Sequence, residues 1–339
     1  MSTLFYSNQP PIERPKPVEL PTPNLNAQLD PAGYIPDDGL VGAVNVALLL
    51  GQPLLLTGEP GTGKTQLAYS LAYQLGLNAP FQFNTKSTST ATDLFYQYDA
   101  LRHFRAVQTC GGESQDAKDY LHYEALGKAI ILTKPAAECE GYLPDGFEHT
   151  GVQRSVVLID EIDKAPRDFP NDILNEIERH YFEVPELKCP QVAGKIEVNR
   201  DLQPIVVLTS NSERHLPDAF MRRCIYYNIA FPNEAALKNI LQKRFTDFDK
   251  VSTDFMAKAQ EFFLTLRSDR LRLEKKPATA ELLNWLTTLR SNVFFKGVDY
   301  PFVKGYLEPL SHSLTSLVKN RRDQETAQIE LEKWLTGYT

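Results

Sequence analysis

The sequence predicts an α/β domain with a parallel central sheet flanked by helices, followed by a smaller, all-helical domain. Continuous apolar, β-branched runs at 156–159 and 205–209 are typical of strands buried on both faces of a parallel sheet. A third apolar run, 54–56, leads through a glycine-rich loop into a helical pattern. After residue 231 the strand patterns stop and only helical apolar stripes follow, which predicts the change of architecture.

The chain of 339 residues is long enough for two domains, and its hydrophobic fraction of 42% is enough for sizeable cores. A net charge of −7 argues against a nucleic-acid binder whose whole surface is basic, although a local basic pore would remain compatible with it. The four cysteines lie far apart and form no C-x-x-C pair: Cys110, Cys139, Cys189 and Cys224. This pattern fits reduced thiols in a cytosol better than a disulfide framework or a zinc site.

Neither a signal peptide nor a membrane span is expected. The N-terminus lacks a basic start followed by an apolar core. The longest apolar run, 44–50, is too short to cross a bilayer. We therefore expect a cytoplasmic protein.

The expected domains are a proline-rich arm over 1–34, an α/β domain over 35–231 and a helical domain over 232–339. The arm lacks apolar periodicity, so it is expected to be extended or disordered. It could lie across a neighbouring subunit, or it could be a loose tail. Residues 85–150 form an enlarged insertion in the α/β domain.

The expected elements follow from apolar periodicity and breakers. A first strand is expected to start at Pro53 and to lead into the glycine-rich loop, and further strands are expected at 81–84, 156–159, 205–209 and 225–229. Residues 182–184 and 196–198 could pair as a hairpin. Helices are expected at 37–50, 64–75 and 121–132, around 173–181, and from residue 218. In the C-terminal domain they are expected at 233–243, 254–267, 278–291 and 302–336.

The glycine-rich loop has the spacing G-x-x-x-x-G-K-T over Gly58–Thr65. Glycines at 61 and 63 let the backbone curl with its N–H groups directed toward a phosphate, and the following helix adds its N-terminal dipole. Lys64 places a cation on the β- and γ-phosphates, and Thr65 offers a hydroxyl to Mg²⁺. The alternative is a plain glycine turn between a strand and a helix.

Polar residues follow the two later buried strands. Asp160 and Glu161 stand where ligands bind in open α/β sheets, beyond the carboxyl end of a strand. Asp160 is suited to hold Mg²⁺, and Glu161 to polarise the water that attacks a γ-phosphate. Asn211 could orient that water. Alone, the two carboxylates would be a helix cap and Asn211 a turn residue.

Two arginines, Arg222 and Arg223, follow the last of these strands. An arginine in this position can point into the nucleotide site of a neighbouring subunit, where it would stabilise charge on the phosphoryl oxygens. The alternative is a surface or ion-pair arginine. The residues do not distinguish which of the two would act.

With these elements in this order the chain resembles an AAA+ ATPase, a P-loop NTPase, and more narrowly the MoxR-like branch. The matching segments are Gly58-Glu59-Pro60-Gly61-Thr62-Gly63-Lys64-Thr65 followed by Gln66 (Walker A), Val157–Pro166 (Walker B), Thr209–Asn211 (sensor 1) and Leu216–Arg223. Leu-Pro-Asp-Ala-Phe before paired arginines is the more MoxR-like signal.

The resemblance implies a ring, usually a hexamer, with ATP and Mg²⁺ at the subunit interfaces. It also implies that hydrolysis is coupled to movement of the helical domain as a lid, and that the protein remodels a protein client in a chaperone-like way. A partner with a von Willebrand factor A domain is often found in the family. The client and the partner are not revealed by these residues.

The chain departs from the family pattern in two places. The long distance from Lys64 to Asp160 indicates that 85–150 is enlarged, and this segment could contact a substrate or partner. The family usually places a sensor 2 arginine at the start of a lid helix, where this chain has Glu274-Lys275-Lys276-Pro277. Lys275 or Lys276 would substitute there, with Lys276 taken as the nucleotide contact, although lysine lacks the planar fork of arginine. A solvated basic turn is the alternative.

Two other functions fit parts of the pattern. A nucleic-acid motor would need basic residues in the pore, and the 182–200 hairpin offers Lys188, Lys195 and Arg200 among several glutamates. A P-loop kinase would transfer the phosphate to a small molecule. The paired carboxylates, the downstream asparagine and the late arginines favour hydrolysis over transfer, so a kinase is less expected. The glutamates of the hairpin weaken the motor, so a nucleic-acid partner is not expected.

Overall fold

The computed structural model describes residues 31–109, 116–187, 194–212, 216–245, 251–290, 301–302 and 304–337. The chain divides into two compact units. The larger comprises residues 30–58 and 63–229, and the smaller includes residues 59–62 and 230–339. The expected proline-rich arm lies outside the described residues up to residue 30, and Pro31–Gly33 form a short 3₁₀-helix.

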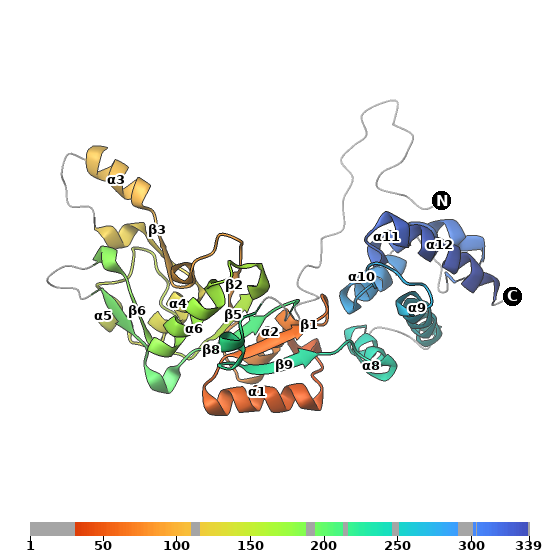
Figure 1. The fold of residues 1–339 in the computed structure, drawn as a ribbon, viewed down its shortest axis with the longest axis horizontal. Helices are drawn as coiled ribbons and strands as arrows, with labels where there is room; N and C mark the ends of the chain where they lie inside the picture. The colour runs from red at the N-terminus through yellow and green to blue at the C-terminus, as the bar shows by residue number, and fades with distance from the viewer. Residues whose placement is uncertain are drawn as a thin grey trace. The chain divides into compact units, whose positions relative to one another are not determined.

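The larger unit is built on a five-stranded parallel sheet, as expected, and its strand order is β2-β5-β8-β1-β9 (Figure 1). Its strands are β1 (Leu54–Gly58), β2 (Phe81–Asn84), β5 (Val156–Asp160), β8 (Ile205–Thr209) and β9 (Ile225–Ile229). The three central strands are almost wholly buried, which explains their continuous apolar sequences. The ends of β1, β5 and β8 therefore lie next to one another at one edge.

Helix α1 begins and ends where the sequence signals predict. Helix α1 (Asp38–Leu50) has Asp37 as its N-cap, with Oδ1 accepting from the Leu40 N–H at 3.0 Å, and ends at Gly51 in the left-handed conformation. Helix α2 (Lys64–Gln74) follows the glycine loop, and α7 (Asp218–Met221) begins at residue 218 as expected. Helix α6 (Phe169–Arg179) begins and ends earlier than the expected 173–181, and Tyr181 belongs to a strand.

The described residues of the segment predicted as an insertion, 85–150, contain two strands and three α-helices. Strands β3 (Tyr96–Tyr98) and β4 (Leu121–Tyr123) pair antiparallel, and the helices are α3 (Ala100–Thr109), α4 (Ala125–Ile131) and α5 (Ala136–Cys139). The helix expected over 121–132 was wrong in its first part. Leu121 and Tyr123 alternate with an exposed residue as a strand, and the helix begins only at Ala125.

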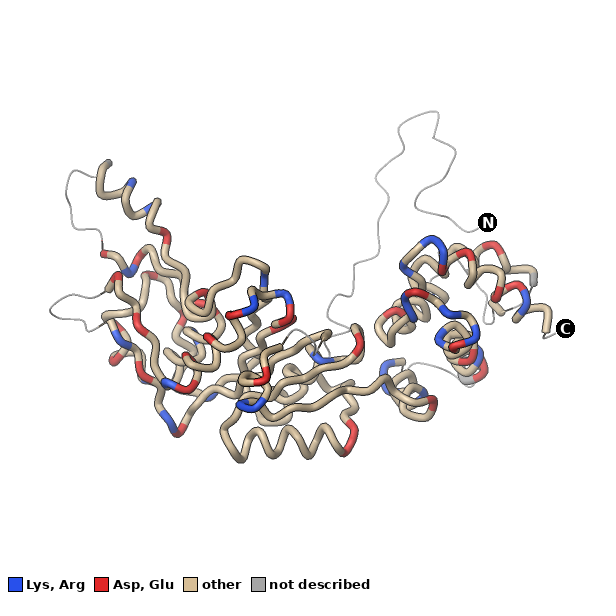
Figure 2. The backbone as a smooth tube through the Cα atoms, viewed as in Figure 1, with Lys and Arg blue, Asp and Glu red and all other residues tan. Residues whose placement is uncertain are grey.

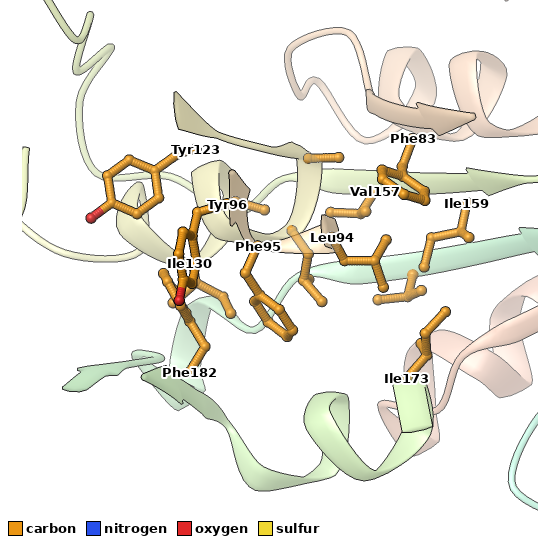
Figure 3. Packing of buried hydrophobic residues seen from close by; sticks show 14 of the residues in the cluster. Phe83, Leu94, Phe95, Tyr96, Tyr123, Ile130, Val157, Ile159, Ile173 and Phe182 are labelled. Atoms are coloured by element: carbon orange, nitrogen blue, oxygen red, sulfur yellow. The ribbon is translucent and has the colours of Figure 1, made fainter. Parts of the chain in front are cut away.

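A second hairpin of β6 (Tyr181–Glu183) and β7 (Lys195–Glu197) shares its core with the insertion. Phe182 stacks on Phe95 with ring centroids 5.0 Å apart and meets the edge of Tyr123 at 6.1 Å. Figure 3 shows these rings gathered beside the sheet residues Val157 and Ile159. The insertion and the hairpin are thus anchored to the α/β domain through one hydrophobic cluster.

The smaller unit is helical in its described residues, as expected. It contains α8 (Glu234–Arg244), α9 (Val251–Arg267), α10 (Thr279–Leu289), α11 (Leu307–Leu317) and α12 (Arg321–Thr336). Its core includes the buried Trp285, whose indole N–H donates to Ser313 Oγ at 2.8 Å. The single helix expected over 302–336 was wrong, because Asn320 caps a new helix by accepting from the Asp323 N–H at 2.8 Å.

Among the described residues, no helix is both long enough and apolar enough to cross a membrane.

Candidate nucleotide-binding site

The loop after β1 has the conformation that its glycines predict. Gly58, Gly61 and Gly63 have φ values of 140°, 75° and 93°, a region that glycine enters without steric cost. Lys64 begins α2, and its side chain is 7% exposed, with Nζ donating to the Gly58 carbonyl at 2.9 Å. This hydrogen bond ties the buried lysine to the start of the loop, so that its cation stands at the N-terminus of α2, where an anion site is expected.

Tyr34 lies against this loop. A Cβ atom added at Gly63 would stand 3.0 Å from the Tyr34 ring, so the ring approaches the backbone as closely as glycine permits. Burial, followed by the nearby Asp37 and Tyr227, raises the pKa of the Tyr34 phenol, which therefore stays neutral. No pattern in the sequence predicts this contact.

The Thr65 hydroxyl and the Asp160 carboxylate meet beside the loop. Thr65 Oγ1 lies 3.2 Å from each of the two Asp160 oxygens. The Thr209 hydroxyl also donates to Asp160 Oδ1, and Gln82 Nε2 lies 3.5 Å from Oδ2. Side chains from α2, β2 and β8 thus hold in place the Asp160 carboxylate, which the sequence predicts as a metal ligand.

Glu161 has an unusual backbone. Its φ of 56° and ψ of 51° are left-handed, a conformation that costs a non-glycine residue energy and is common at functional sites. Its N–H donates to Thr209 Oγ1 at 2.9 Å, which holds the turn. The carboxylate pairs with the Lys164 ammonium, and this hydrogen bond raises the pKa of Lys164.

Asn211 meets Glu161 across the ends of β8 and β5. Its Nδ2 lies 3.3 Å from Glu161 Oε1, and its backbone N–H donates to Asp163 Oδ1 at 3.1 Å. The structure therefore brings together the carboxylate and the amide that the sequence predicts to act on one water molecule.

The two arginines differ in their contacts. Arg223 Nη1 donates to Asn175 Oδ1 at 3.1 Å, and its Nε lies 3.6 Å from Glu178 Oε1, both on α6. Arg222 is exposed and forms no ion pair with any carboxylate among the described residues. Neither arginine contacts the nucleotide loop of its own chain in the described contacts, which leaves the assignment of the trans arginine a prediction.

The lysines predicted as sensor 2 lie in the smaller unit, before α10. Lys276 Nζ lies 2.6 Å from Asp269 Oδ1, and this contact lowers the pKa of Asp269. The backbone N–H of Lys275 donates to the buried carboxylate of Asp323 at 2.9 Å. Nucleotide contact by either lysine stays a prediction.

The donor atoms fit a magnesium nucleotide. Oxygen ligands of the kind that Thr65 and Asp160 offer are those that Mg²⁺ prefers, completed by water and phosphate oxygens. The described residues contain no group of three or more histidine, cysteine or carboxylate side chains that would form a metal site without phosphate. The oxygens of Thr65 and Asp160 would therefore hold Mg²⁺ mainly together with the phosphates of a bound nucleotide.

Sequence reasoning missed three residues of the site: Thr209, Asp163 and Lys164. Each lies within three residues of a predicted site residue, but its contact crosses from one strand end to another or turns back on the chain. The order of polar residues along the chain carries no signal for these pairings.

Solved AAA proteins are among the structures that are similar to this chain. It resembles the FIGL-1 AAA domain in complex with ADP at 15% identity and a TM-score of 0.36, covering 85% of this chain and 76% of that one. It also resembles the S. cerevisiae Hsp104-ADP complex at 17% identity and a TM-score of 0.42, covering 69% and 43%. No curated protein sequence matches the chain.

The family match agrees with the geometry of the loop, the paired carboxylates and the sensor asparagine. The family described as AAA domain (dynein-related subfamily) matches residues 53–224, which run from the start of β1 to just before β9 and make up half of the chain. The chain therefore belongs to the AAA domain family, in its dynein-related subfamily.

Proposed function

We propose that this protein hydrolyses ATP and couples hydrolysis to the remodelling of a protein client, as a MoxR-like member of the AAA+ family. One observation carries the proposal. Glu161 and Asn211, from two neighbouring strands, share a hydrogen bond of 3.3 Å beside the strand that leads into the glycine loop. A phosphate-binding loop alone would serve a kinase as well, but this pair is suited to act on water.

Each residue has a role that its contacts support. The loop N–H groups and Lys64 would bind the β- and γ-phosphates, and Thr65 and Asp160 would hold Mg²⁺, which neutralises developing charge on the phosphates. Glu161 would accept a proton from the attacking water while Asn211 orients it. The Thr209 hydroxyl holds the Asp160 carboxylate and the backbone of Glu161 in place, since it donates to Asp160 Oδ1 and accepts from the Glu161 N–H.

A ring would complete the site. Arg222 and Arg223 are both exposed at the surface of the larger unit, where a neighbouring subunit could receive either of them. Arg222 is the stronger candidate for the trans arginine, since Arg223 is already engaged by Asn175 and Glu178. We expect the chain to form a homo-oligomer, which in the family it resembles is usually a hexamer. We expect it to work in the cytoplasm, and a protein with a von Willebrand factor A domain is a candidate partner.

The test is release of inorganic phosphate from ATP and Mg²⁺ by the purified full chain, without any acceptor. An ATPase turns over, a kinase is nearly silent, and Lys64→Ala serves as the inactive control. The turnover of Arg222→Ala and of Arg223→Ala is then compared with that of the wild type, at protein concentrations below and above those at which the chain assembles. The mass of the assembly is measured in the presence of ATP. Absence of hydrolysis at every concentration overturns the proposal, and equal turnover by monomers and assemblies overturns the trans arginine.

The described part of the hairpin gives little support to a nucleic-acid motor. Lys195 Nζ lies 2.6 Å from Glu197 Oε1 and 4.0 Å from the centre of the Tyr181 ring, so its charge is already compensated. Lys188 lies outside the described residues. Stimulation of ATP hydrolysis by DNA or RNA would nevertheless support a nucleic-acid motor.

A further inference from the structure

The larger unit has a cavity at the edge of the sheet opposite the nucleotide loop. It measures about 90 Å³ and lies at the starts of β1 and β8, where Pro53 and Ile205 line it. Helix α1 contributes Ala47 and Leu48, and Ile177 of α6 adds a further apolar side chain. None of the nucleotide-site residues described above lines this cavity.

Two arginines are the only charged residues that line the cavity, and both belong to the larger unit. Arg154 precedes β5 and Arg200 precedes β8. Arg154 Nη2 donates to the backbone carbonyl of Asp201 at 2.7 Å, which leaves its charge without a carboxylate partner. Arg200 contributes only weakly to the lowered pKa of Glu197, whose carboxylate is paired with Lys195. Among the described residues neither arginine forms an ion pair, so the cavity offers two cations to an anion.

An exposed apolar surface adjoins this cavity along the chain. Leu49 and Leu50 lie between Leu48 and Gly51, which both line the cavity, and they are 83% and 57% exposed. The apolar face continues along α1 through Val46, which is 43% exposed. In Figure 2 the tube of α1 carries no charged residue beyond its first turn. A helix that is apolar on nearly all sides is usually covered by another surface.

We propose that this face binds a segment of a partner protein in which a carboxylate stands next to apolar side chains. The carboxylate would enter the cavity between Arg154 and Arg200, and the apolar side chains would cover Leu49 and Leu50. Charge complementarity selects the acidic group, because no described carboxylate lines the cavity. The exposed leucines select a protein segment over a small free anion, which would leave them in water.

The experiment selects binders from a library of random 12-residue peptides displayed on phage, using the full chain as bait. Enriched peptides are synthesised, and their affinities are measured by fluorescence anisotropy for the wild type, Arg200→Glu and Leu49→Asn. Both positions are exposed, so these variants are expected to fold, whereas Arg154→Gln removes a backbone contact and serves only as support. Arg321→Glu and Ile329→Asn on α12 are the matched controls, since they change an exposed charge and an exposed apolar residue elsewhere.

We expect enriched peptides to share an aspartate or glutamate beside leucine, isoleucine or phenylalanine. Arg200→Glu and Leu49→Asn should each weaken their binding tenfold or more, while the α12 controls bind as the wild type does. Replacing the peptide carboxylate with an amide should cause a similar loss. Three outcomes overturn the proposal: no enrichment, binding unaffected by Arg200→Glu, or full competition by millimolar acetate or phosphate with no effect of Leu49→Asn. A change of oligomeric mass in Arg200→Glu also overturns it, since the occupant would then be a second copy of the chain.

Discussion

The Glu161 carboxylate and the Asn211 amide are in contact, with 3.3 Å between Oε1 and Nδ2, although the residues are 50 positions apart in the sequence. The contact exists because β5 and β8 are adjacent, parallel strands that end at the same edge of the sheet. It joins a proton acceptor to a group that can orient water, and the proposed chemistry depends on it.

Replacing Glu161 with glutamine should keep ATP binding and remove most hydrolysis. Glutamine has nearly the same shape and can still contact Asn211, but it cannot accept a proton from water. We expect turnover to fall about 100-fold or more, with nucleotide affinity changed only a few-fold. Phosphate release and binding of a fluorescent nucleotide measure the two effects. Glu176→Gln, which alters a surface ion pair with Arg179, is the control. Unchanged turnover in Glu161→Gln would remove Glu161 from this role.

Gly63→Ala should weaken the binding of nucleotide. The added Cβ would stand 3.0 Å from the Tyr34 ring at a φ of 93°, so the loop or the ring must shift. We expect a loss of affinity of about tenfold or more, equivalent to roughly 1.4 kcal/mol. Gly76→Ala is the matched control, because Gly76 has a φ of 67° with open space around it. If both variants bind nucleotide as the wild type does, the close contact with Tyr34 has no role in the site.

Gly127→Ala should destabilise the larger unit. A Cβ on this residue of α4 would overlap the carbonyl oxygen of Phe95, which is backbone and cannot rotate away. We expect a loss of about 2 kcal/mol in the free energy of unfolding. Gly42→Ala, on the exposed side of α1 with no atom within 4 Å, should instead add roughly 0.5–1 kcal/mol. Urea unfolding followed by circular dichroism measures both, and equal stabilities would contradict the packing of α4 on Phe95.

Stability should fall as the pH rises above about 9, in part because of Cys224. Burial raises the pKa of this thiol to about 12 from an ordinary value of 9.0. Below pH 9 both states keep the proton, whereas between 9 and 12 only the unfolded state releases it, so rising pH favours unfolding. The contribution of Cys224 should be about 1 kcal/mol smaller at pH 10 than at pH 8.

Cys224→Ala isolates this contribution, since the other buried thiol, Cys139, is present in both proteins. Urea unfolding at pH 8 and pH 10 should show a smaller loss of stability in the variant than in the wild type. An identical loss in both proteins would show that the Cys224 thiol does not titrate in this window.

The three central strands, β1, β5 and β8, could be predicted from the sequence because their burial leaves a continuous apolar pattern. The segment 121–132 could not, since a three-residue strand and a short helix adjoin there and their apolar residues merge into one stripe. The break near Asn320 was missed for a related reason. The apolar residues of α11 and α12 continue a helical spacing, and only the cap by Asn320 separates the helices.

The candidate site shows the same division. The residues of the loop and the polar residues after each strand could be named because their type and order carry the chemistry. The contacts of Thr209 with Asp160 and Glu161 could not, because they depend on which strands are neighbours and on their register. The left-handed turn at Glu161 was likewise invisible, since glutamate rarely adopts it.

The stacking of Phe182 on Phe95 has a mechanical consequence. Phe95 precedes β3 and Phe182 belongs to β6, so the two rings are separate in sequence but share one hydrophobic cluster. Packed interiors transmit strain, so a displacement of β6 would also load the segment that carries Phe95. A force on either segment would therefore reach the buried residues of β5 and α6 in the same cluster.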